Sequence, residues 1–200
     1  MSKLETERLT LRPFRRADAL NFAQLAGDWA VASMTSDIRY PLSEVQALAW
    51  LKPARGEVRF AIEREGRLIG GVGFYRRRSG AAELGFWLGR PWWRNGYATE
   101  AARAVVLHGF KTRRLPGFSS AHFVDNPASA RVLAKLGFEP VGRGTIVCAA
   151  RGHDVEAVTY WLDHERAALA IPMLAPERSE EPRWRTWLGR LRTARGGATP

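Results

Sequence analysis

The sequence predicts a mixed α/β fold: one twisted, mostly antiparallel sheet of about seven strands, with helices on both faces and a central β-α-β crossover. Two observations lead to this fold class. Segments with strand alternation and segments with helical spacing follow one another in the order β-α-α-β-β-β-α-β-α-β-β. In addition, an apolar strand at 81–89 passes through a short turn into an alanine-rich helix at 97–111, and a further strand is expected at 118–124. Two strands joined through a helix in this way run parallel.

The N-terminal part of the chain is expected to supply one strand and three helices. Apolar and polar residues alternate over about 8–14, as in a strand with one buried face. Residues 18–34 carry an apolar helical stripe that is interrupted at Gly27-Asp28, which favours two short helices, the first capped by Asp18. A third helix begins at Ser43, where Ser43-Glu44-Val45-Gln46 has the form of a capping box.

Three strands follow in an antiparallel meander, at about 58–64, 68–76 and 81–89. Glu65-Gly66 lies between the first two strands and fits a tight hairpin turn. In the crossover helix at 97–111, apolar residues recur at helical spacing and the last turn is basic, which suits a helix C-terminus.

After the crossover unit, the chain is expected to form a short helix and then two more strands of the sheet. Asn126 and Pro127 are residue types favoured at a helix N-cap and at the first helical position, and Gly137 is a favoured C-cap. Strands at about 138–149 and 155–162 complete the sheet.

Length and composition favour one domain followed by a basic tail. The chain has 200 residues, of which 46% are hydrophobic, and a formal net charge of +11. This length and hydrophobic content are enough for one substantial core and too little for two ordinary domains. We therefore expect a domain at 1–165 and a partly disordered tail at 166–200, in which 183–192 can form a short basic amphipathic helix. The tail could contact a ribosome or an anionic surface, or fold back on its own domain.

Several other classes are disfavoured. No stretch approaches the roughly 18 uncharged apolar residues of a membrane span, and the N-terminus lacks an apolar signal region, so we expect a cytoplasmic protein. The single cysteine, Cys148, cannot form an internal disulfide, and no cluster has zinc-ligand spacing, so no metal site is expected. The positive charge alone does not distinguish RNA, an acidic membrane or a phosphorylated cofactor.

The turn before the crossover helix has the features of a phosphate-binding site. Several backbone N–H groups at a helix N-terminus have no intrahelical partner, and the helix dipole adds positive potential there. Gly96 and Ala98 leave room for a ligand to approach the backbone. The alternative is an ordinary helix start with no ligand.

These segments together resemble the GNAT acetyltransferase superfamily, and within it the ribosomal-protein N-acetyltransferase (RimJ/RimL-type) branch. The resemblance rests on the element order, on Thr6–Pro13, on the turn Trp93–Ala98 and on Asp125–Phe138, and it covers about 3–165. It implies a GNAT-like fold, with acetyl-coenzyme A as donor and a primary amine as acceptor.

The resemblance also implies which residues bind coenzyme A. They are Trp87, Leu88, Arg94, Asn95, Gly96, Tyr97, Ala98, Thr99, Asn126 and Ser129. The turn departs from the family pattern at Trp93, where glutamine or arginine is expected, and at Arg94, where the branch often has glycine. Because backbone N–H groups make the main contacts, these departures leave the implied cofactor unchanged. Trp87 has a second interpretation as a core residue.

The implied chemistry needs a base for the ammonium and a proton donor for the departing thiolate. Glu83 is the candidate base; alternatively, it is a surface carboxylate paired with an arginine such as Arg76. Many family members use a helical tyrosine as the acid, but the matching position here is Leu133. Ser129 matches a serine that the branch places early in this helix, although it could serve only the helix start. Of the histidines, His122 alone lies beside the expected site.

The expected function is therefore transfer of an acetyl group from acetyl-coenzyme A to an amine by direct attack. The branch implies a protein N-terminus as acceptor, such as that of a ribosomal protein, and by analogy the region Trp29–Tyr40 shapes the acceptor site. Two alternatives stay open: a small amine acceptor such as a polyamine, amino acid or antibiotic, and a non-catalytic module that senses coenzyme A. The oligomeric state is left open.

Overall fold

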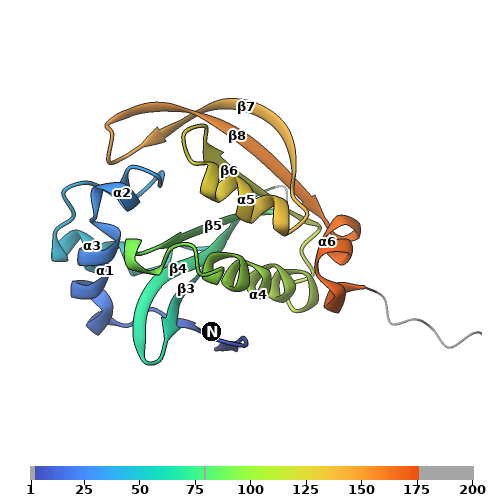
Figure 1. The fold of residues 1–200 in the computed structure, drawn as a ribbon, viewed down its shortest axis with the longest axis horizontal. Coiled ribbons are helices and arrows are strands. Elements are labelled where there is room, and N and C mark those ends of the chain that lie inside the picture. The colour runs from blue at the N-terminus through green and yellow to red at the C-terminus, as the bar shows by residue number, and fades with distance from the viewer. Residues whose placement is uncertain (1–2, 79, 176–200) are drawn as a thin grey trace, which may run out of the picture.

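In the computed structural model, which describes residues 3–78 and 80–175, the chain forms one open sheet of eight strands (Figure 1). The strand order is β1-β2-β3-β4-β5-β6-β8-β7, and neighbours are antiparallel except for the parallel pair β5 and β6. The strands are β1 Leu4–Glu5, β2 Thr10–Pro13, β3 Glu57–Arg64, β4 Arg67–Arg76, β5 Ala82–Leu88, β6 Gly117–Phe123, β7 Glu139–Cys148 and β8 His153–Asp163. The predicted sheet with one parallel crossover is confirmed. The unexpected eighth strand, β1, has two residues, too few to show alternation.

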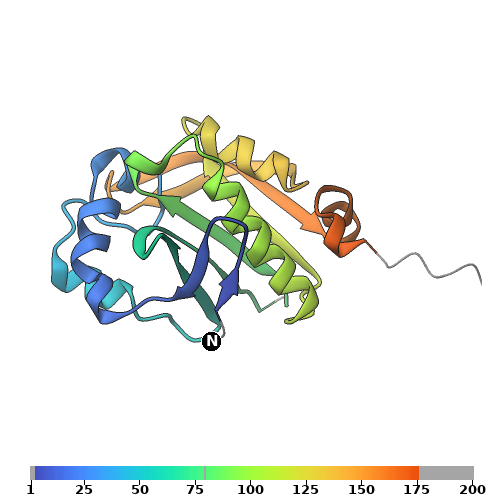
Figure 2. The same cartoon turned by 60° about the horizontal axis from the view of Figure 1, so that its bottom comes forward.

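Helices cover both faces of the sheet, as expected (Figures 1 and 2). They are α1 Ala19–Ala26, α2 Trp29–Ala32, α3 Glu44–Trp50, α4 Tyr97–Lys111, α5 Pro127–Lys135 and α6 His164–Ala170, with single 3-10 turns at Arg16–Asp18, Arg90–Trp92 and Pro172–Leu174. On one face, α4 packs against the main core with Phe60 and Leu84. On the other face, Ala61 and Trp87 share a second core with α1, α2 and α3. Successive strand residues thus serve opposite cores.

Local hydrogen bonds explain most element boundaries. The Ser43 hydroxyl accepts from the Gln46 N–H at 3.3 Å, and the Gln46 side chain accepts from the Ser43 N–H at 2.9 Å, which is the predicted capping box. The Glu65-Gly66 turn has φ angles of 51° and 77°, as a two-residue hairpin requires. Asp18 differs from expectation, because its carboxylate does not cap α1; it accepts from the Arg15 N–H at 2.7 Å and pairs with Arg12.

Packing of the domain continues past the boundary expected at residue 165. The helix α6 follows β8 directly, and Ala167, Ile171 and Leu174 are buried in the main core. These apolar residues after position 165 therefore belong to the domain and not to the tail. The predicted amphipathic helix at 183–192 lies outside the described residues.

The strands β5 and β6 separate soon after they meet. Their parallel pairing is confined to Ala82 with Phe118 and Glu83 with Ser119. One step further, the Ser120 hydroxyl donates to the Leu84 carbonyl at 2.9 Å, so a side chain replaces the backbone pairing. Beyond this point the two strands diverge and leave a wedge in the middle of the sheet.

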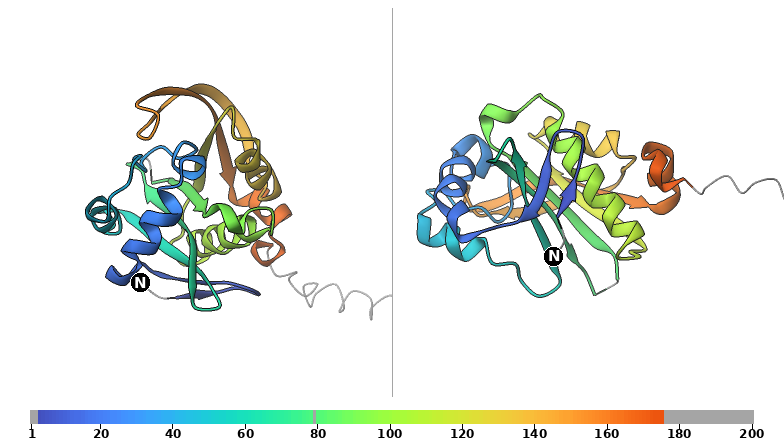
Figure 3. Two further views of the ribbon diagram at one scale, coloured as in Figure 1. Left: turned by 60° about the vertical axis from the view of Figure 1, so that its left-hand side comes forward. Right: turned by 90° about the horizontal axis from the view of Figure 1, so that it is seen from below.

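The hairpin of β7 and β8 reaches across this wedge to the N-terminal helices (Figures 1 and 3). At its tip, the Ala149 N–H donates to the Ser36 carbonyl at 2.9 Å, and Arg151 Nε donates to the Ser33 carbonyl at 2.8 Å. Segments more than 100 residues apart thereby meet above the wedge.

Candidate functional site

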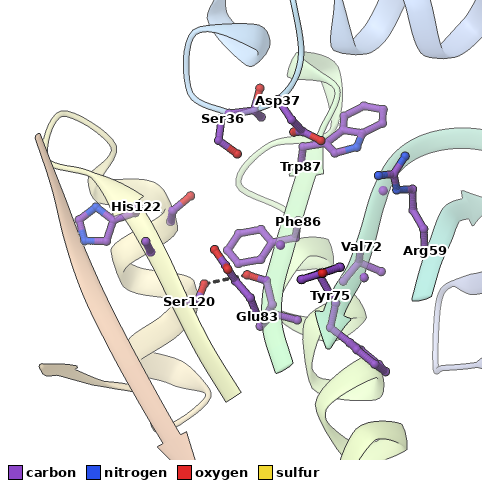
Figure 4. A pocket seen from close by; sticks show the side chains of 18 of the residues that line it. Ser36, Asp37, Arg59, Val72, Tyr75, Glu83, Phe86, Trp87, Ser120 and His122 are labelled. Carbon is purple, nitrogen blue, oxygen red and sulfur yellow. Dashed lines mark hydrogen bonds between the residues drawn. The ribbon is translucent and has the colours of Figure 1, made fainter. Parts of the chain in front are cut away.

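A cavity of about 300 Å³ lies on the α1–α3 side of the sheet, where β5 and β6 diverge (Figure 4). Its floor is formed by alternate residues of the two central strands: Gly71, Gly73, Tyr75, Glu83, Gly85 and Trp87. The loop that carries Ser36 and Asp37 lies at the Trp87 end, whereas Tyr75 lies near Glu83 at the other end (Figure 4). This loop belongs to the region Trp29–Tyr40, which was expected to shape an acceptor site, and it forms the cavity wall at the Trp87 end.

The wall on the β3 side is held by a set of linked polar groups. The Arg59 guanidinium lies 3.7 Å from the ring centroid of Trp50 and forms an ion pair with Glu57. The Trp50 indole N–H donates to Asp37 at 2.8 Å. These contacts join β3, α3 and the loop after α2, so they fix one side of the cavity in place.

The candidate base Glu83 faces the cavity from β5. Its side chain is 38% exposed and forms an ion pair with Arg77. The arginine named from the sequence, Arg76, is the register partner of Ala82 and is not the partner of Glu83. Arg77 follows β4 directly, where the chain has left the sheet. Glu83 therefore combines the two expected features, a place in the cavity and an arginine partner.

Ser129 lines the cavity from the first turn of α5. Its backbone N–H donates to the Asn126 side chain at 3.1 Å, so Asn126 is the predicted N-cap. Leu133, at the position where many relatives carry a tyrosine, is fully buried in the core. No acid can act from there.

His122 also lines the cavity, from β6. Its Nδ1 lies 2.7 Å from the Phe123 carbonyl, and its Nε2 lies 3.1 Å from the Tyr160 hydroxyl. The carbonyl can only accept, so Nδ1 carries a proton, and in the neutral ring Nε2 accepts from the Tyr160 hydroxyl. Sequence reasoning overlooked Tyr160, because the pairing of β6 with β8 across 38 residues leaves no local signal.

The expected phosphate-binding turn opens α4 at the end of β5. Arg94 and Gly96 have positive φ angles of 63° and 80°, so the turn is left-handed at both. The first helical bond of α4 runs from the Glu100 N–H to the Gly96 carbonyl at 3.1 Å, and no side chain caps Gly96. The backbone N–H groups between Gly96 and Glu100, including those of Ala98 and Thr99, therefore have no hydrogen-bond partner within the helix.

The side chains of this segment differ in their roles. Tyr97 and Leu88 are buried in the main core, so only their backbone groups can face a ligand. Asn95 donates to the Trp93 carbonyl at 2.9 Å and so stiffens the turn. Trp87 is 7% exposed, packs edge-to-face on Phe22 and also lines the cavity, so it is a core residue; its contact with coenzyme A stays a prediction.

An N-terminal residue supports the turn in a way that the sequence did not indicate. Arg8 Nη1 donates to the Asn95 carbonyl at 3.1 Å, and Nε donates to Glu100 at 2.7 Å. Burial acts to raise the pKa of Glu100, but hydrogen bonds from Thr6 and Arg8 outweigh burial and lower that pKa. Glu100 is thus held as an anion by the N-terminal segment, and Arg8 lies between this anion and the turn.

Within 3–78 and 80–175, no three histidine, cysteine or carboxylate side chains are grouped so that they could bind a metal ion. In the same residues, no helix combines the length and apolar character that crossing a bilayer requires.

The model of the Acetyltransferase (GNAT) domain matches residues 8–139. The chain is also 36% identical over 149 residues to the uncharacterized N-acetyltransferase YoaA of Bacillus subtilis (strain 168), with 70% of this chain and 84% of that protein covered. The chain belongs to the GNAT acetyltransferase family. It is therefore an acetyl-coenzyme A-dependent acyltransferase, as the resemblance implied.

Solved GNAT structures share this fold. The RimL ribosomal L7/L12 α-N-protein acetyltransferase in complex with coenzyme A has a TM-score of 0.70 at 17% identity, covering 81% of this chain and 98% of that chain. RimJ of Mycobacterium smegmatis in complex with CoA-disulfide has a TM-score of 0.72 at 19% identity, covering 86% and 92%. The predicted GNAT-like architecture is thus confirmed.

Proposed function

We propose that this GNAT protein acetylates a primary amine that enters the cavity, while acetyl-coenzyme A reaches the same point through the wedge between β5 and β6. One observation supports this most directly: β5 carries Glu83 on the cavity floor, and the chain passes from the end of β5 through the 3-10 turn Arg90–Trp92 to the turn at Arg94–Ala98. A strand and a short ordered connection thus place a carboxylate and a candidate phosphate-binding turn on the same segment of chain.

In this proposal the amides of the turn bind the pyrophosphate of coenzyme A, and the pantetheine arm lies in the wedge beside Asn126 and Ser129. Donors at a helix N-terminus and the helix dipole both favour an anion there. Arg94 adds positive charge in the turn, and Arg8, which is paired with Glu100, supports the turn through its hydrogen bond to the Asn95 carbonyl.

The chemical steps follow from the positions of the side chains. The ammonium gives a proton to Glu83, directly or through water, and the free amine attacks the thioester carbonyl carbon. The tetrahedral intermediate then collapses and the C–S bond breaks; the attacking nitrogen gives up its extra proton, and the departing thiolate takes up that proton through the Ser129 hydroxyl. The products are the acetylated amine and coenzyme A, and no covalent enzyme intermediate forms.

For the acceptor we favour a protein N-terminus, as in the RimL protein that shares the fold. A small amine such as a polyamine, amino acid or antibiotic is the alternative. Release of free thiol, measured with pooled N-terminal peptides and with pooled small amines, tests both. Binding of acetyl-coenzyme A without thiol release on any amine would instead support a sensing role.

Contact of the tail with a ribosome or an anionic surface stays a prediction, as does the cytoplasmic location. Deleting 176–200 and measuring pelleting with ribosomes and with anionic liposomes tests the former. Unchanged pelleting rejects it.

A further inference from the structure

Gly85 occupies an unusual place for a glycine. It lies in the middle of β5, a central strand, directly opposite Gly73 of β4. It is exposed on the cavity floor, at a point where β5 is paired with β4 but already separated from β6. Glycine in a strand interior is unfavourable by roughly 0.5–1 kcal/mol relative to alanine, because it loses more backbone entropy and packs no side chain.

The other glycines of the floor have a packing reason. A Cβ atom on Gly73 would lie 2.2 Å from the Val58 carbonyl oxygen, and a Cβ on Gly71 would lie 2.5 Å from the indole nitrogen of Trp87. Backbone or a buried ring thus excludes side chains at both positions.

Neither packing nor backbone conformation explains Gly85. A Cβ atom there would meet no heavy atom within 4 Å, and its φ angle lies outside the positive range that favours glycine. Gly144 of β7 is equally open and also has no positive φ, but it lies outside the cavity. The open space above Gly85 belongs to the cavity, so a side chain at this position would occupy space that a ligand could use.

The two neighbours of Gly85 on this face define that ligand's position. Side chains two residues apart on a strand are about 7 Å apart, so the bare Cα of Gly85 lies between the carboxylate of Glu83 and the ring of Trp87. Figure 4 shows Glu83 and Trp87 along β5 with Phe86 between them. A molecule that extends between the carboxylate and the ring must cross Gly85.

We propose that Gly85 is a specificity-determining residue. The part of the acceptor next to the amine lies across Gly85, where the absence of a side chain on the glycine leaves room for the acceptor. The inference rests on the proposed function. It commits to an acceptor class, primary amines on an unbranched carbon or with a small substituent, because a branch next to the amine would press on the floor.

The test uses Gly85→Ala and Gly85→Val, with Gly144→Ala and Gly144→Val as matched controls. The acceptors are two pairs that differ only in branching next to the amine: n-butylamine with sec-butylamine, and a peptide beginning with glycine with the same peptide beginning with valine. Initial rates give kcat/KM for each amine, calorimetry gives the Kd of acetyl-coenzyme A, and thermal unfolding gives Tm.

We expect wild type to favour the unbranched member of whichever pair it acetylates by about tenfold in kcat/KM. Gly85→Ala should lower kcat/KM by about tenfold, most for the branched amine, and Gly85→Val should lower it further. For Gly85→Ala the Kd of acetyl-coenzyme A should match wild type and the Tm should be equal or slightly higher, because one methyl fits the open space and alanine is favoured over glycine inside a strand. Both Gly144 variants should keep wild-type kinetics.

Four outcomes overturn the inference. The first is kcat/KM within twofold of wild type for Gly85→Ala and Gly85→Val on every amine. The second is a loss of acetyl-coenzyme A affinity as large as the loss of kcat/KM, which would mean that Gly85 contacts the donor and not the acceptor. The third is a lower Tm for Gly85→Ala, which would give the glycine a packing role. The fourth is a wild type that binds acetyl-coenzyme A but acetylates no amine, which removes the proposed function and this inference together.

Discussion

Replacing Asp18 by alanine tests the ion pair that joins β2 to the start of α1. Arg12 donates to both carboxylate oxygens of Asp18, at 2.8 and 2.9 Å, and the Arg15 N–H donates a third hydrogen bond at 2.7 Å. The Arg12 and Asp18 side chains are only 7% and 9% exposed. After the substitution, Glu63 is the remaining ionic partner of Arg12, through Nε at 2.5 Å.

The expected loss of stability follows from this burial. Removing one partner of a buried ion pair costs about 3–5 kcal/mol, because the other charge stays buried. Since Glu63 keeps part of the compensation, we expect the free energy of unfolding to fall by about 3 kcal/mol for Asp18→Ala. For Asp18→Asn, which keeps one acceptor oxygen, we expect about 2 kcal/mol. A loss of 3 kcal/mol corresponds to a decrease in Tm of roughly 6–12 °C in a domain of this size.

Urea unfolding followed by tryptophan fluorescence at neutral pH measures this loss. Glu5→Gln is the control, because the Lys3–Glu5 pair is exposed, and its unfolding midpoint should match wild type. A loss below about 1 kcal/mol for Asp18→Ala would contradict the argument that the pair holds β2 to α1.

The same pair predicts how stability depends on pH. Burial acts to raise the pKa of Asp18, but the hydrogen bonds from Arg12 and from the Arg15 N–H, together with the charges of both arginines, outweigh it, so this pKa lies below its usual value of 3.8. Because the folded pKa is below the unfolded one, the stabilisation is complete above about pH 4 and is lost as the pH falls through the folded pKa. The advantage of wild type over Asp18→Asn should thus be constant near neutrality and shrink below about pH 4.

Three further substitutions test the site. Glu83→Gln should lower kcat by about 100-fold in the thiol-release assay, while the Kd of acetyl-coenzyme A stays unchanged, because the carboxylate acts on the acceptor. Gly96→Val should weaken acetyl-coenzyme A binding in calorimetry by about tenfold, because valine is strained at a φ of 80° and obstructs the turn. Arg8→Met should weaken the same binding by about threefold without changing kcat at saturation, because the turn loses the hydrogen bond to its backbone.

Controls separate these effects from misfolding. Arg77→Met removes the ion-pair partner of Glu83 and should keep activity within tenfold of wild type, since an exposed pair contributes little. Equal activity of Glu83→Gln and wild type across the pH range removes Glu83 from the mechanism. Unchanged affinity in Gly96→Val counts against phosphate binding at the turn, and a lower kcat in Arg8→Met at saturating donor contradicts a purely positioning role.

Elements with strong local signals could be predicted from the sequence. The capping box at Ser43, the N-cap at Asn126 and the hairpin at Glu65-Gly66 all formed as expected, because neighbouring residues make their hydrogen bonds. The one parallel strand pair was predictable because a helix joins its strands.

Features that depend on distant residues could not be predicted. The bond between Arg8 and Glu100 spans 92 residues, and that between His122 and Tyr160 spans 38. The partner of Glu83 was placed one residue too early, because the sequence does not show that Arg76 lies opposite Ala82 and that Arg77, just past the end of β4, reaches Glu83.

One consequence concerns the direction in which a polypeptide acceptor would leave the cavity. The loop with Ser36 and Asp37, to which the β7–β8 hairpin is hydrogen-bonded, lies at the Trp87 end, so we expect the rest of the polypeptide to emerge at the end that Tyr75 flanks. There it would pass the exposed side chains of Arg77 and Arg78, which follow β4. Acidic residues downstream of the acetylated one would be attracted, and basic ones repelled, over the screening distance of about 8 Å at physiological salt.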